Sequence, residues 1–200
     1  MSAGMEAITY DHPDILPIEG MPDIHLRLTR PDDGDELFDV IEQDRKHLEP
    51  FQWWVREVRT PEQAAEHARK AVGRTDAGHS LQYRVIKGDP AQDGPMIGTI
   101  TVYQRDPSSN MARFGYWLTS AEQGQGYATA ATARVLEEAK ASLHLQRVDA
   151  HIPEKNTRSQ LLAKRLGCTM LDGASYRKLV PIAGSPKKQS FTVDRWAKIL

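Results

Sequence analysis

The sequence predicts an α/β (α+β) protein with a mixed, mostly antiparallel sheet of about six to seven strands, flanked by helices and splayed between its fourth and fifth strands. Three observations support this class. Short turns join several strand-like segments, which is typical of antiparallel neighbours. A strand–helix–strand unit follows, and its two strands must be parallel with a right-handed crossover. A loop with two glycines, residues 123–129, stands at the strand-to-helix junction of this unit.

The first third of the chain supplies one strand and two helices. Residues 1–22 contain several prolines and glycines and are expected to form an irregular lead-in. Residues 24–29 alternate apolar and polar side chains, as a half-buried strand does. Residues 35–46 repeat apolar side chains at helical spacing. An aromatic, non-periodic stretch at 48–54 follows. A threonine N-cap and a first-turn proline then begin a second helix, residues 61–72.

The middle of the chain predicts an antiparallel meander. Apolar and β-branched residues mark strands at 81–86, 96–103 and 111–119. Turn-forming residues separate them at 87–94 and 106–110. Because both connections are short, each strand is expected to pair with the one before it.

The last third begins with the helix of the strand–helix–strand unit. An apolar stripe at helical spacing predicts a helix over 127–144, followed by a strand at 147–152. Asn156 can cap a further helix, which Gly167 would end. Two final strands are expected at 169–181 and 189–199, joined by a loop with glycine and proline. We expect residues 23–200 to form a single domain, since no linker or repeat interrupts them.

Composition limits the function classes. The chain has 200 residues, 40% hydrophobic and 26% charged, as an ordinary soluble globular protein has. Its formal net charge of -1 gives no reason to expect nucleic acid as a partner, and no apolar run is long enough for a membrane span. The single cysteine, Cys168, fits a reducing compartment and is expected to be a small buried residue. The N-terminus carries no signal-peptide pattern, so the expected location is cytoplasmic, as a monomer or homodimer.

The glycine loop predicts a phosphate-binding turn. Gly124 and Gly126 permit positive φ, and N–H groups at a helix N-terminus attract phosphate oxygens. A dinucleotide fingerprint is a weaker reading, with Thr129 in place of its third glycine and Asp149 as the ribose acid, because hairpins rather than βαβ units precede the loop. No lysine follows the glycines, which excludes a P-loop. A tight turn that binds nothing is the alternative.

The motifs in order resemble the GNAT superfamily of acetyl-CoA-dependent N-acetyltransferases over residues 24–200. The segment 123–128, Gln-Gly-Gln-Gly-Tyr-Ala, fits the family's Q/R-x-x-G-x-G/A motif. The chain looks most like the branch that contains the ribosomal-protein N-terminal acetyltransferases RimJ and RimL. The features that point to this branch are Phe114-Gly115-Tyr116-Trp117-Leu118, Tyr127-Ala128-Thr129-Ala130, Asn156-x-x-Ser159 with Leu166-Gly167, and a C-terminal strand with Asp194.

The resemblance implies a site for acetyl-CoA, with no metal. Backbone groups of Trp117, Leu118 and Thr119 would pair with the pantetheine arm, and Asn156 would hydrogen-bond it. The loop would hold the pyrophosphate through the N–H groups of Gly124, Gln125, Gly126, Tyr127, Ala128 and Thr129, with Gln123 as the first motif residue.

The acid and base for acetyl transfer are less well marked. An amine attacks the thioester, so a base must keep it neutral and an acid can protonate the leaving thiolate. The family's tyrosine acid is replaced by Ala163, and Ser159 becomes the acid candidate, although it can equally serve the backbone at the helix start. A glutamate often precedes the Gly-Tyr-Trp segment in the branch that the chain resembles, and here that position is Arg113. The remaining base candidates are Glu42 and His151, with Glu49 and His47 behind them.

The expected reaction is direct acetyl transfer from acetyl-CoA to a primary amine, most favourably a protein or peptide N-terminal α-amine. Phe51, Trp53 and Trp54 fall in the region that would line the acceptor pocket, and one of the two tryptophans is expected to reach it. Two alternatives remain. The acceptor can be a small-molecule amine, or the chain can be a non-catalytic acyl-CoA-binding module, which the substitutions Ala163 and Arg113 favour.

Overall fold

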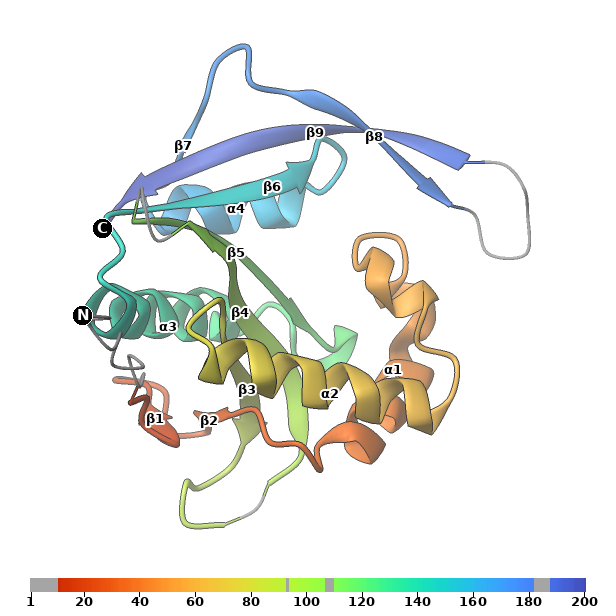
Figure 1. Cartoon of the computed structure of the whole chain (residues 1–200), viewed down its shortest axis with the longest axis vertical. Helices are drawn as coiled ribbons and strands as arrows, with labels where there is room; N and C mark the ends of the chain where they lie inside the picture. The colour runs from red at the N-terminus through yellow and green to blue at the C-terminus, as the bar shows by residue number, and fades with distance from the viewer. Residues whose placement is uncertain (1–10, 93, 107–109, 182–187) are drawn as a thin grey trace, which may run out of the picture.

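The computed structural model describes residues 11–92, 94–106, 110–181 and 188–200. Within them one sheet has the strand order β1-β2-β3-β4-β5-β6-β9-β7, with β8 paired to β9 (Figure 1). The strands are β1 (Ile15–Pro17), β2 (Ile24–Leu28), β3 (Leu81–Lys87), β4 (Met96–Asp106), β5 (Met111–Leu118), β6 (Arg147–Pro153), β7 (Thr169–Met170), β8 (Tyr176–Pro181) and β9 (Lys188–Ile199). The helices are α1 (Gly34–Leu48), η1 (Trp53–Arg56), α2 (Pro61–Asp76), η2 (Ser120–Glu122), α3 (Tyr127–Leu143) and α4 (Thr157–Arg165).

The sheet is mixed and mostly antiparallel, as predicted. Neighbours from β1 to β5 are antiparallel, and β6 pairs antiparallel with β9 along its whole length. The one parallel ladder among the described strands joins β5 to β6, and it covers only 111–113 and 147–149. Beyond these residues the two strands diverge, so β6, β9 and β8 form a separate arm above the rest of the sheet (Figure 1). The predicted splay between the fourth and fifth expected strands is confirmed.

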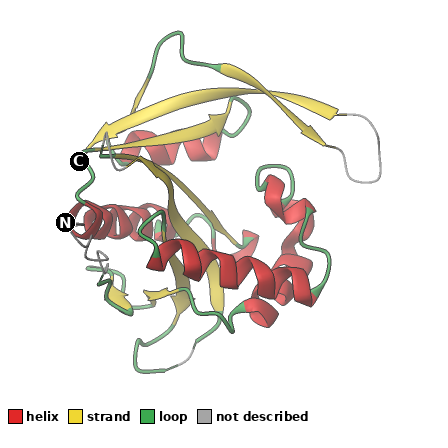
Figure 2. Cartoon of the chain, viewed as in Figure 1, coloured by secondary structure: helices red, strands yellow, loops and turns green. Residues whose placement is uncertain are grey.

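Helices cover both faces of the larger part of the sheet (Figure 2). Apolar side chains of α3 pack on one face, in a cluster that includes Val135, Leu136 and Ile100. A smaller cluster under α1 and α2 buries the other face. Cys168 belongs to the first cluster, where burial raises the pKa of its thiol to about 11. In the described parts of the chain no helix combines the length and apolar character of a membrane span.

Local signals fixed the helix starts more closely than the helix ends. Thr60 accepts a hydrogen bond from the N–H of Gln63, whose side chain bonds back, and Pro61 opens α2 as predicted. The helix nevertheless continues to Asp76, beyond the expected end near residue 72, because its last turns still bury Ala71 and Thr75.

Two predicted segments differ in the structure. Residues 15–17, in the expected irregular lead-in, form β1, which pairs with β2 and buries Leu16. The expected strand 169–181 divides into β7 and β8, because Gly173 takes a positive φ of 68° between them. Of the lead-in, residues 1–10 lie outside the described part, as do most of the turn at 106–110 and the loop 182–187.

A buried carboxylate joins three elements at the base of the sheet. Asp33, just before α1, accepts hydrogen bonds from Arg27 of β2 at 2.8 Å and from Arg84 of β3 at 3.1 Å. It also accepts the backbone N–H of Arg30 at 2.7 Å. All three side chains are less than 10% exposed, and burial lowers the pKa of Arg84. In the described chain Asp33 is thus the one carboxylate that forms an ion pair with either guanidinium group.

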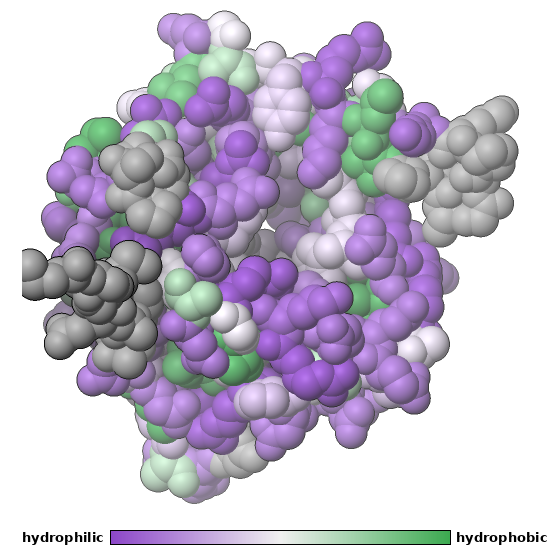
Figure 3. Space-filling model, viewed as in Figure 1, coloured by the Kyte–Doolittle hydropathy of each residue, from purple (hydrophilic) through white to green (hydrophobic). Residues whose placement is uncertain are grey.

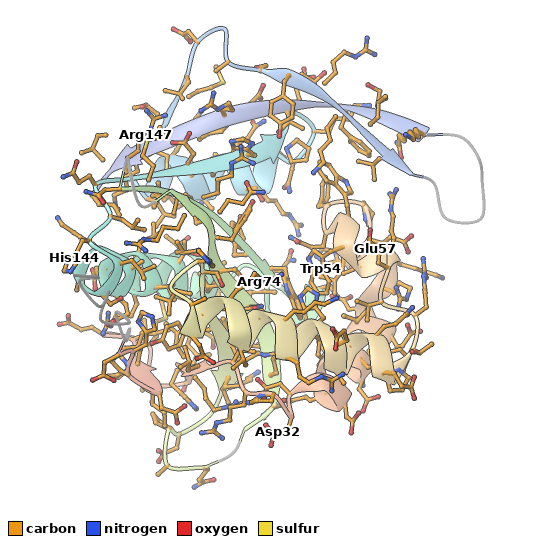
Figure 4. All side chains as sticks on the ribbon, in the orientation of Figure 1. Asp32, Trp54, Glu57, Arg74, His144 and Arg147 are labelled. Carbon is orange, nitrogen blue, oxygen red and sulfur yellow. The ribbon has the colours of Figure 1, made fainter. Side chains whose placement is uncertain are left out.

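We expect Asp33→Asn to lower the free energy of unfolding by about 3 kcal/mol or more, because it leaves two buried guanidinium groups without a counter-charge. Urea unfolding followed by circular dichroism measures the change. Asp32→Asn is the matched control, since Asp32 is an exposed neighbour at the surface (Figure 4) and should change stability by less than about 0.5 kcal/mol. Equal losses in the two variants would contradict the structural role of Asp33.

Candidate functional site

The divergence of β5 and β6 opens two adjoining cavities. The first, which we call the loop groove, has a volume of about 470 Å³ and lies between the end of β5, the glycine loop and the start of α4. The second, the aromatic cavity, has a volume of about 560 Å³ and lies between the sheet, η1, α2, β6 and β8. Figure 3 shows a hollow near the middle of this face, rimmed by hydrophilic side chains. The two cavities share Phe51, Gln52, Tyr116, Trp117, Asn156, Ser159 and Leu162.

The glycine loop exposes backbone N–H groups to the loop groove. Gly124 and Gly126 both have φ of 84°, a conformation that L side chains rarely adopt, and Gly126 is the N-cap of α3. Within the described chain, the N–H groups of residues 124–128 donate to no backbone or side-chain acceptor. Thr129 differs from the prediction, because its N–H donates to the Gly126 carbonyl at 3.0 Å. Five consecutive N–H groups at a helix start are thus available for phosphate oxygens.

The loop is held in place from α1. Helix α1 has a non-helical residue at Asp44, with φ of -121°. Its carboxylate accepts the N–H of Ser120 at 2.6 Å and the Ser120 hydroxyl at 2.7 Å. This contact spans 76 residues in the sequence and fixes the segment that leads from β5 into the glycines.

The edge of β5 that faces β6 offers unpaired backbone groups beyond Arg113. Side-chain amides already occupy two of its carbonyls: Gln52 donates to Tyr116 O at 2.9 Å, and Gln123 donates to Leu118 O at 3.4 Å. The Thr119 N–H instead donates to Ile97 O of β4, at 2.9 Å. Because backbone groups alternate in direction along an antiparallel strand, the N–H and C=O of Trp117 also point toward β4, where Trp117 is opposite Thr99. Of the three residues predicted to pair with the pantetheine arm, only Leu118 therefore directs its backbone groups into the opening. Tyr116, which was not among the three, does so as well.

Basic side chains close the loop groove on the side of α4 and α1. Asn156 caps α4 as predicted, accepting the Ser159 N–H at 3.2 Å. Arg158 donates to the Gln123 side-chain oxygen, and Gln123 Nε2 lies 2.5 Å from His47 Nε2. Arg158 could not be assigned from the sequence, because a lone arginine in the first turn of a helix carries no specific signal.

Two hydroxyl groups meet at the junction of the cavities. Tyr116 Oη donates to Ser159 Oγ at 2.9 Å, which links β5 to α4 across the opening. Burial raises the pKa of Tyr116, so the phenol is protonated at neutral pH. Ala163, at the position of the family's tyrosine, is 1% exposed and offers no hydroxyl. Sequence reasoning missed Tyr116 because only the fold brings residues 43 positions apart into contact.

The base candidates separate by position. Glu42 bonds Arg45, and Glu49 lies 3.3 Å from Arg59; neither residue lines the loop groove or the aromatic cavity. His47 lines the loop groove. His151 lines the aromatic cavity, with Nδ1 2.9 Å from Tyr176 Oη and a buried Nε2 that has no partner in the described chain.

The electrostatic surroundings of His151 keep it neutral. Burial, followed by the nearby charges of Arg113 and Arg195, lowers the pKa of His151 to about 4. Asp149 opposes this effect, but its carboxylate is bonded to Arg147 and Arg195. At neutral pH the ring therefore carries no charge and has one nitrogen that can accept a proton.

Aromatic side chains wall the second cavity. Both Trp53 and Trp54 line it, whereas the sequence analysis expected only one. Trp54 stacks on His67 of α2 with ring centroids 4.4 Å apart, and its Nε1–H donates to Gln52 at 3.2 Å. Lys178 of β8 lies over the Trp53 ring, 4.0 Å from its centroid. Phe51 lies at the entrance, 37% exposed.

The floor of the aromatic cavity includes Gly115 and Thr99. A Cβ at Gly115 would come 3.4 Å from the Tyr103 ring, which lies across the strand. Thr99, also on the floor, has a buried hydroxyl without a partner in the described chain. The cavity thus combines apolar walls with a few unpaired polar groups, as small-ligand sites do.

Comparisons with known proteins agree with this geometry. The model of the acetyltransferase (GNAT) domain matches residues 23–169. A relative in Bacillus subtilis (strain 168), "Putative ribosomal N-acetyltransferase YdaF", is 26% identical over 147 residues, which are 72% of this chain and 76% of that protein.

Solved structures share the fold at lower identity. The ribosomal L7/L12 α-N-protein acetyltransferase RimL, in complex with coenzyme A, superposes with a TM-score of 0.80 at 18% identity, covering 93% of this chain and 98% of that chain. The microcin C7 self-immunity acetyltransferase MccE, in complex with acetyl-CoA and AMP, has a TM-score of 0.76 at 19% identity, covering 89% and 93%.

The buried His67 predicts acid sensitivity. Burial and the neighbouring Arg84 lower the pKa of His67 to about 4, so the unfolded chain binds a proton that the folded chain does not. The folded state therefore keeps its full stability above the pKa of 6.5 that the ring has in the unfolded chain, and it loses stability as the pH falls from there toward 4. Over that window we expect His67→Phe, which keeps the stack on Trp54, to reduce the slope of unfolding free energy by up to about 1.4 kcal/mol per pH unit.

The measurement is urea unfolding at several pH values. His144→Asn serves as the control, because His144 has a φ of 52° outside the site, and asparagine tolerates that conformation. An unchanged slope in His67→Phe would show that the His67 ring is solvated in the folded protein.

Proposed function

Since the chain belongs to the GNAT acetyltransferase family, we propose that it acetylates the free α-amine at the N-terminus of a protein or peptide. It is an acetyltransferase with acetyl-CoA as the donor. The observation that carries the donor part of the proposal is the row of five unpaired N–H groups at residues 124–128, most of which line the loop groove, and this groove adjoins the aromatic cavity. The relative in Bacillus subtilis, named "Putative ribosomal N-acetyltransferase YdaF", supports a protein acceptor. The runner-up acceptor is a small-molecule amine.

The residues of the loop groove fit acetyl-CoA. The N–H groups of residues 124–128 would hold its pyrophosphate, with Arg158 adding positive charge nearby. The carbonyls of Tyr116 and Leu118 face the opening, where each accepts an N–H of a side-chain amide. The amides of a pantetheine arm are donors of the same kind and would bind at the same carbonyls. Asn156 uses its oxygen for the α4 cap, and its NH₂ group stays free for a ligand oxygen. When bound, acetyl-CoA supplies a thioester carbonyl that an amine can attack.

The aromatic cavity would hold the acceptor amine in its neutral form. Arg113 and Lys178 line it, and nearby positive charge disfavours a second cation, which lowers the pKa of a bound ammonium group. His151, neutral and with an unpartnered Nε2, is the group placed to take the proton. Direct transfer with both substrates bound needs no nucleophile from the protein. Cys168 is buried, which is consistent with this route.

The Tyr116–Ser159 pair would supply the second proton. It holds two hydroxyl groups 2.9 Å apart where the loop groove meets the aromatic cavity. A sulfur leaving from the groove needs a proton at this point. We assign Ser159 as the donor and Tyr116 as the group that restores its proton.

We place the reaction in the cytoplasm, because the single thiol suits a reducing compartment.

The acceptor is tested by thiol release from acetyl-CoA. We expect turnover with short peptides that have a free N-terminus, at least about tenfold less with small amines at equal concentration, and none with the same peptides blocked at the N-terminus, because peptides contact more of the aromatic cavity. Mass spectrometry locates the acetyl group. A preference for small amines would replace the peptide by the runner-up.

Thermal unfolding is the control for donor binding. Acetyl-CoA and CoA at about 100 times their Kd should each stabilise the protein by roughly 2.7 kcal/mol, while NAD should have no effect. Stabilisation by NAD alone would favour the dinucleotide reading of the glycine loop.

Tyr116→Phe tests the proton donor. We expect kcat to fall about 10- to 100-fold, because the hydroxyl pair loses the group that reprotonates Ser159, while thermal stabilisation by CoA stays unchanged. Tyr103→Phe is the matched control: it removes a hydroxyl from the same cavity, and no hydrogen bond of Tyr103 Oη occurs in the described chain. A Tyr116→Phe enzyme with wild-type kcat would remove Tyr116 from the mechanism.

A further inference from the structure

The aromatic cavity is positively charged and has no acidic residue in its described lining. Arg74, Arg113 and Lys178 contribute side chains to it, together with His67, His79 and His151. Figure 4 shows Arg74 and Trp54 on the side of α2 that faces the opening. An amine acceptor is itself a potential cation, so this charge does not serve to attract the amine.

The cations of the cavity lack counter-charges within the protein. In the described part of the chain, none of the ion pairs involves Arg74, Arg113 or Lys178. Arg147 and Arg195, by contrast, both pair with Asp149 close by. The charges of the cavity are thus left unbalanced although the fold pairs arginines nearby.

Two of these cations are close enough to repel each other. Burial lowers the pKa of Lys178, and the charge of Arg113 lowers it further. Arg113 comes from the floor strand β5 and Lys178 from β8, on the opposite side of the splay. The charges of Arg113 and Lys178 also lower the pKa of His151 on β6, after the larger effect of burial. Arg113 and Lys178 are thus like charges from two strands, and an anion bound between them would relieve their repulsion.

We infer that the acceptor carries an anionic group close to its amine and that Arg113 and Lys178 bind this group. The inference rests on the proposed function, which makes the acceptor a peptide. The chemical class is therefore an N-terminal peptide with aspartate or glutamate directly after its first residue. A guanidinium fork binds a carboxylate through two parallel hydrogen bonds, and the lysine adds a point charge. The same cations would reject an N-terminus rich in lysine or arginine.

The position of Arg113 gives the inference a second support. Arg113 lines the cavity from β5, two residues before Gly115, and no acid in the described lining neutralises it. An acceptor with an anionic group suits a guanidinium at this point, whereas a cationic acceptor does not.

The first experiment compares three peptides that differ only in charge: Ser-Glu-Glu-Ala-Ala, Ser-Gln-Gln-Ala-Ala and Ser-Lys-Lys-Ala-Ala. We expect kcat/KM to be about tenfold or more higher for the glutamate peptide than for the glutamine peptide, since hydrogen bonds between charged groups are stronger than those to a neutral amide. The lysine peptide should be the poorest. Equal kcat/KM for all three would overturn the inference while leaving peptide acetylation intact.

Variants assign the preference to the two residues. Arg113→Gln and Lys178→Gln should each reduce the ratio of kcat/KM for the glutamate peptide over the glutamine peptide by about tenfold, and Arg113→Glu should favour the lysine peptide. The control is Arg177→Gln, which removes a positive charge from the same strand outside the cavity, where Arg177 bonds Ser190. A ratio unchanged in Arg113→Gln, or equally reduced in Arg177→Gln, would contradict the assignment.

A binding measurement separates this inference from the proposed function. N-acetylated versions of the glutamate and glutamine peptides are titrated into the full chain with CoA present, and calorimetry gives Kd without turnover. Tighter binding of the glutamate peptide, weakened about tenfold in Arg113→Gln, supports the anion site even if no peptide is acetylated. No difference in Kd overturns it. A last experiment compares acetylation of O-phosphoethanolamine with that of ethanolamine. A kcat/KM for the phosphorylated amine above that of every peptide would assign the anionic group to a small-molecule acceptor and overturn the peptide class.

Discussion

The structure depends on the short parallel ladder between β5 and β6. Only 111–113 of β5 pair with 147–149 of β6, and β6 then takes β9 as its antiparallel partner. If the ladder continued, every backbone group of β5 would be bonded within the sheet and the strand would offer nothing to a ligand. The divergence leaves one edge of β5 open at its C-terminal end, beside the glycine loop. Both cavities form in the space that this divergence creates.

Contacts from distant parts of the chain keep that opening in a defined shape. Asp44 of α1 fixes the segment before the glycine loop, and Gln52 bonds the edge of β5. Trp53 packs against Phe191 of β9, with ring centroids 5.4 Å apart, so the α1–α2 connection also contacts the separate arm of the sheet. The binding surfaces are therefore carried by loops, but loops that are tied to helices and strands by specific hydrogen bonds and ring contacts.

The charged side chains of the protein fall into two groups. At the base of the sheet, Asp33 neutralises Arg27 and Arg84 and joins β2, β3 and the start of α1. In the aromatic cavity, Arg113 and Lys178 have no such acid in the described chain. Paired charges contribute to a stable fold, whereas unpaired charges facing a cavity are suited to a ligand. Burial, followed by the charges of Arg113 and Arg195, keeps His151 uncharged at neutral pH.

The sequence by itself determined the elements and the family. Period-two alternation marked β2, apolar and β-branched residues between turns marked β3 to β5, and helical spacing marked α1 and α3. The caps at Thr60 and Asn156 fixed two helix starts. All these signals act between residues a few positions apart. The glycine loop was found for the same reason: positive φ at Gly124 and Gly126 is a local requirement. Short pairings such as β1, and the division into β7 and β8, were not predicted, because they depend on partner strands rather than on local pattern.

Only the tertiary structure decided which side chains meet at the site. Tyr116 and Ser159 are 43 residues apart, and Gln123 and His47 are 76 apart, so no local pattern could pair them. It also removed Glu42 from the list of bases, since Arg45 holds its carboxylate outside the cavities, and it gathered Arg113 and Lys178 into one pocket. The physical reason is that periodicity and capping are encoded over a few residues. The charge and shape of a cavity arise from the packing of whole strands and helices against one another.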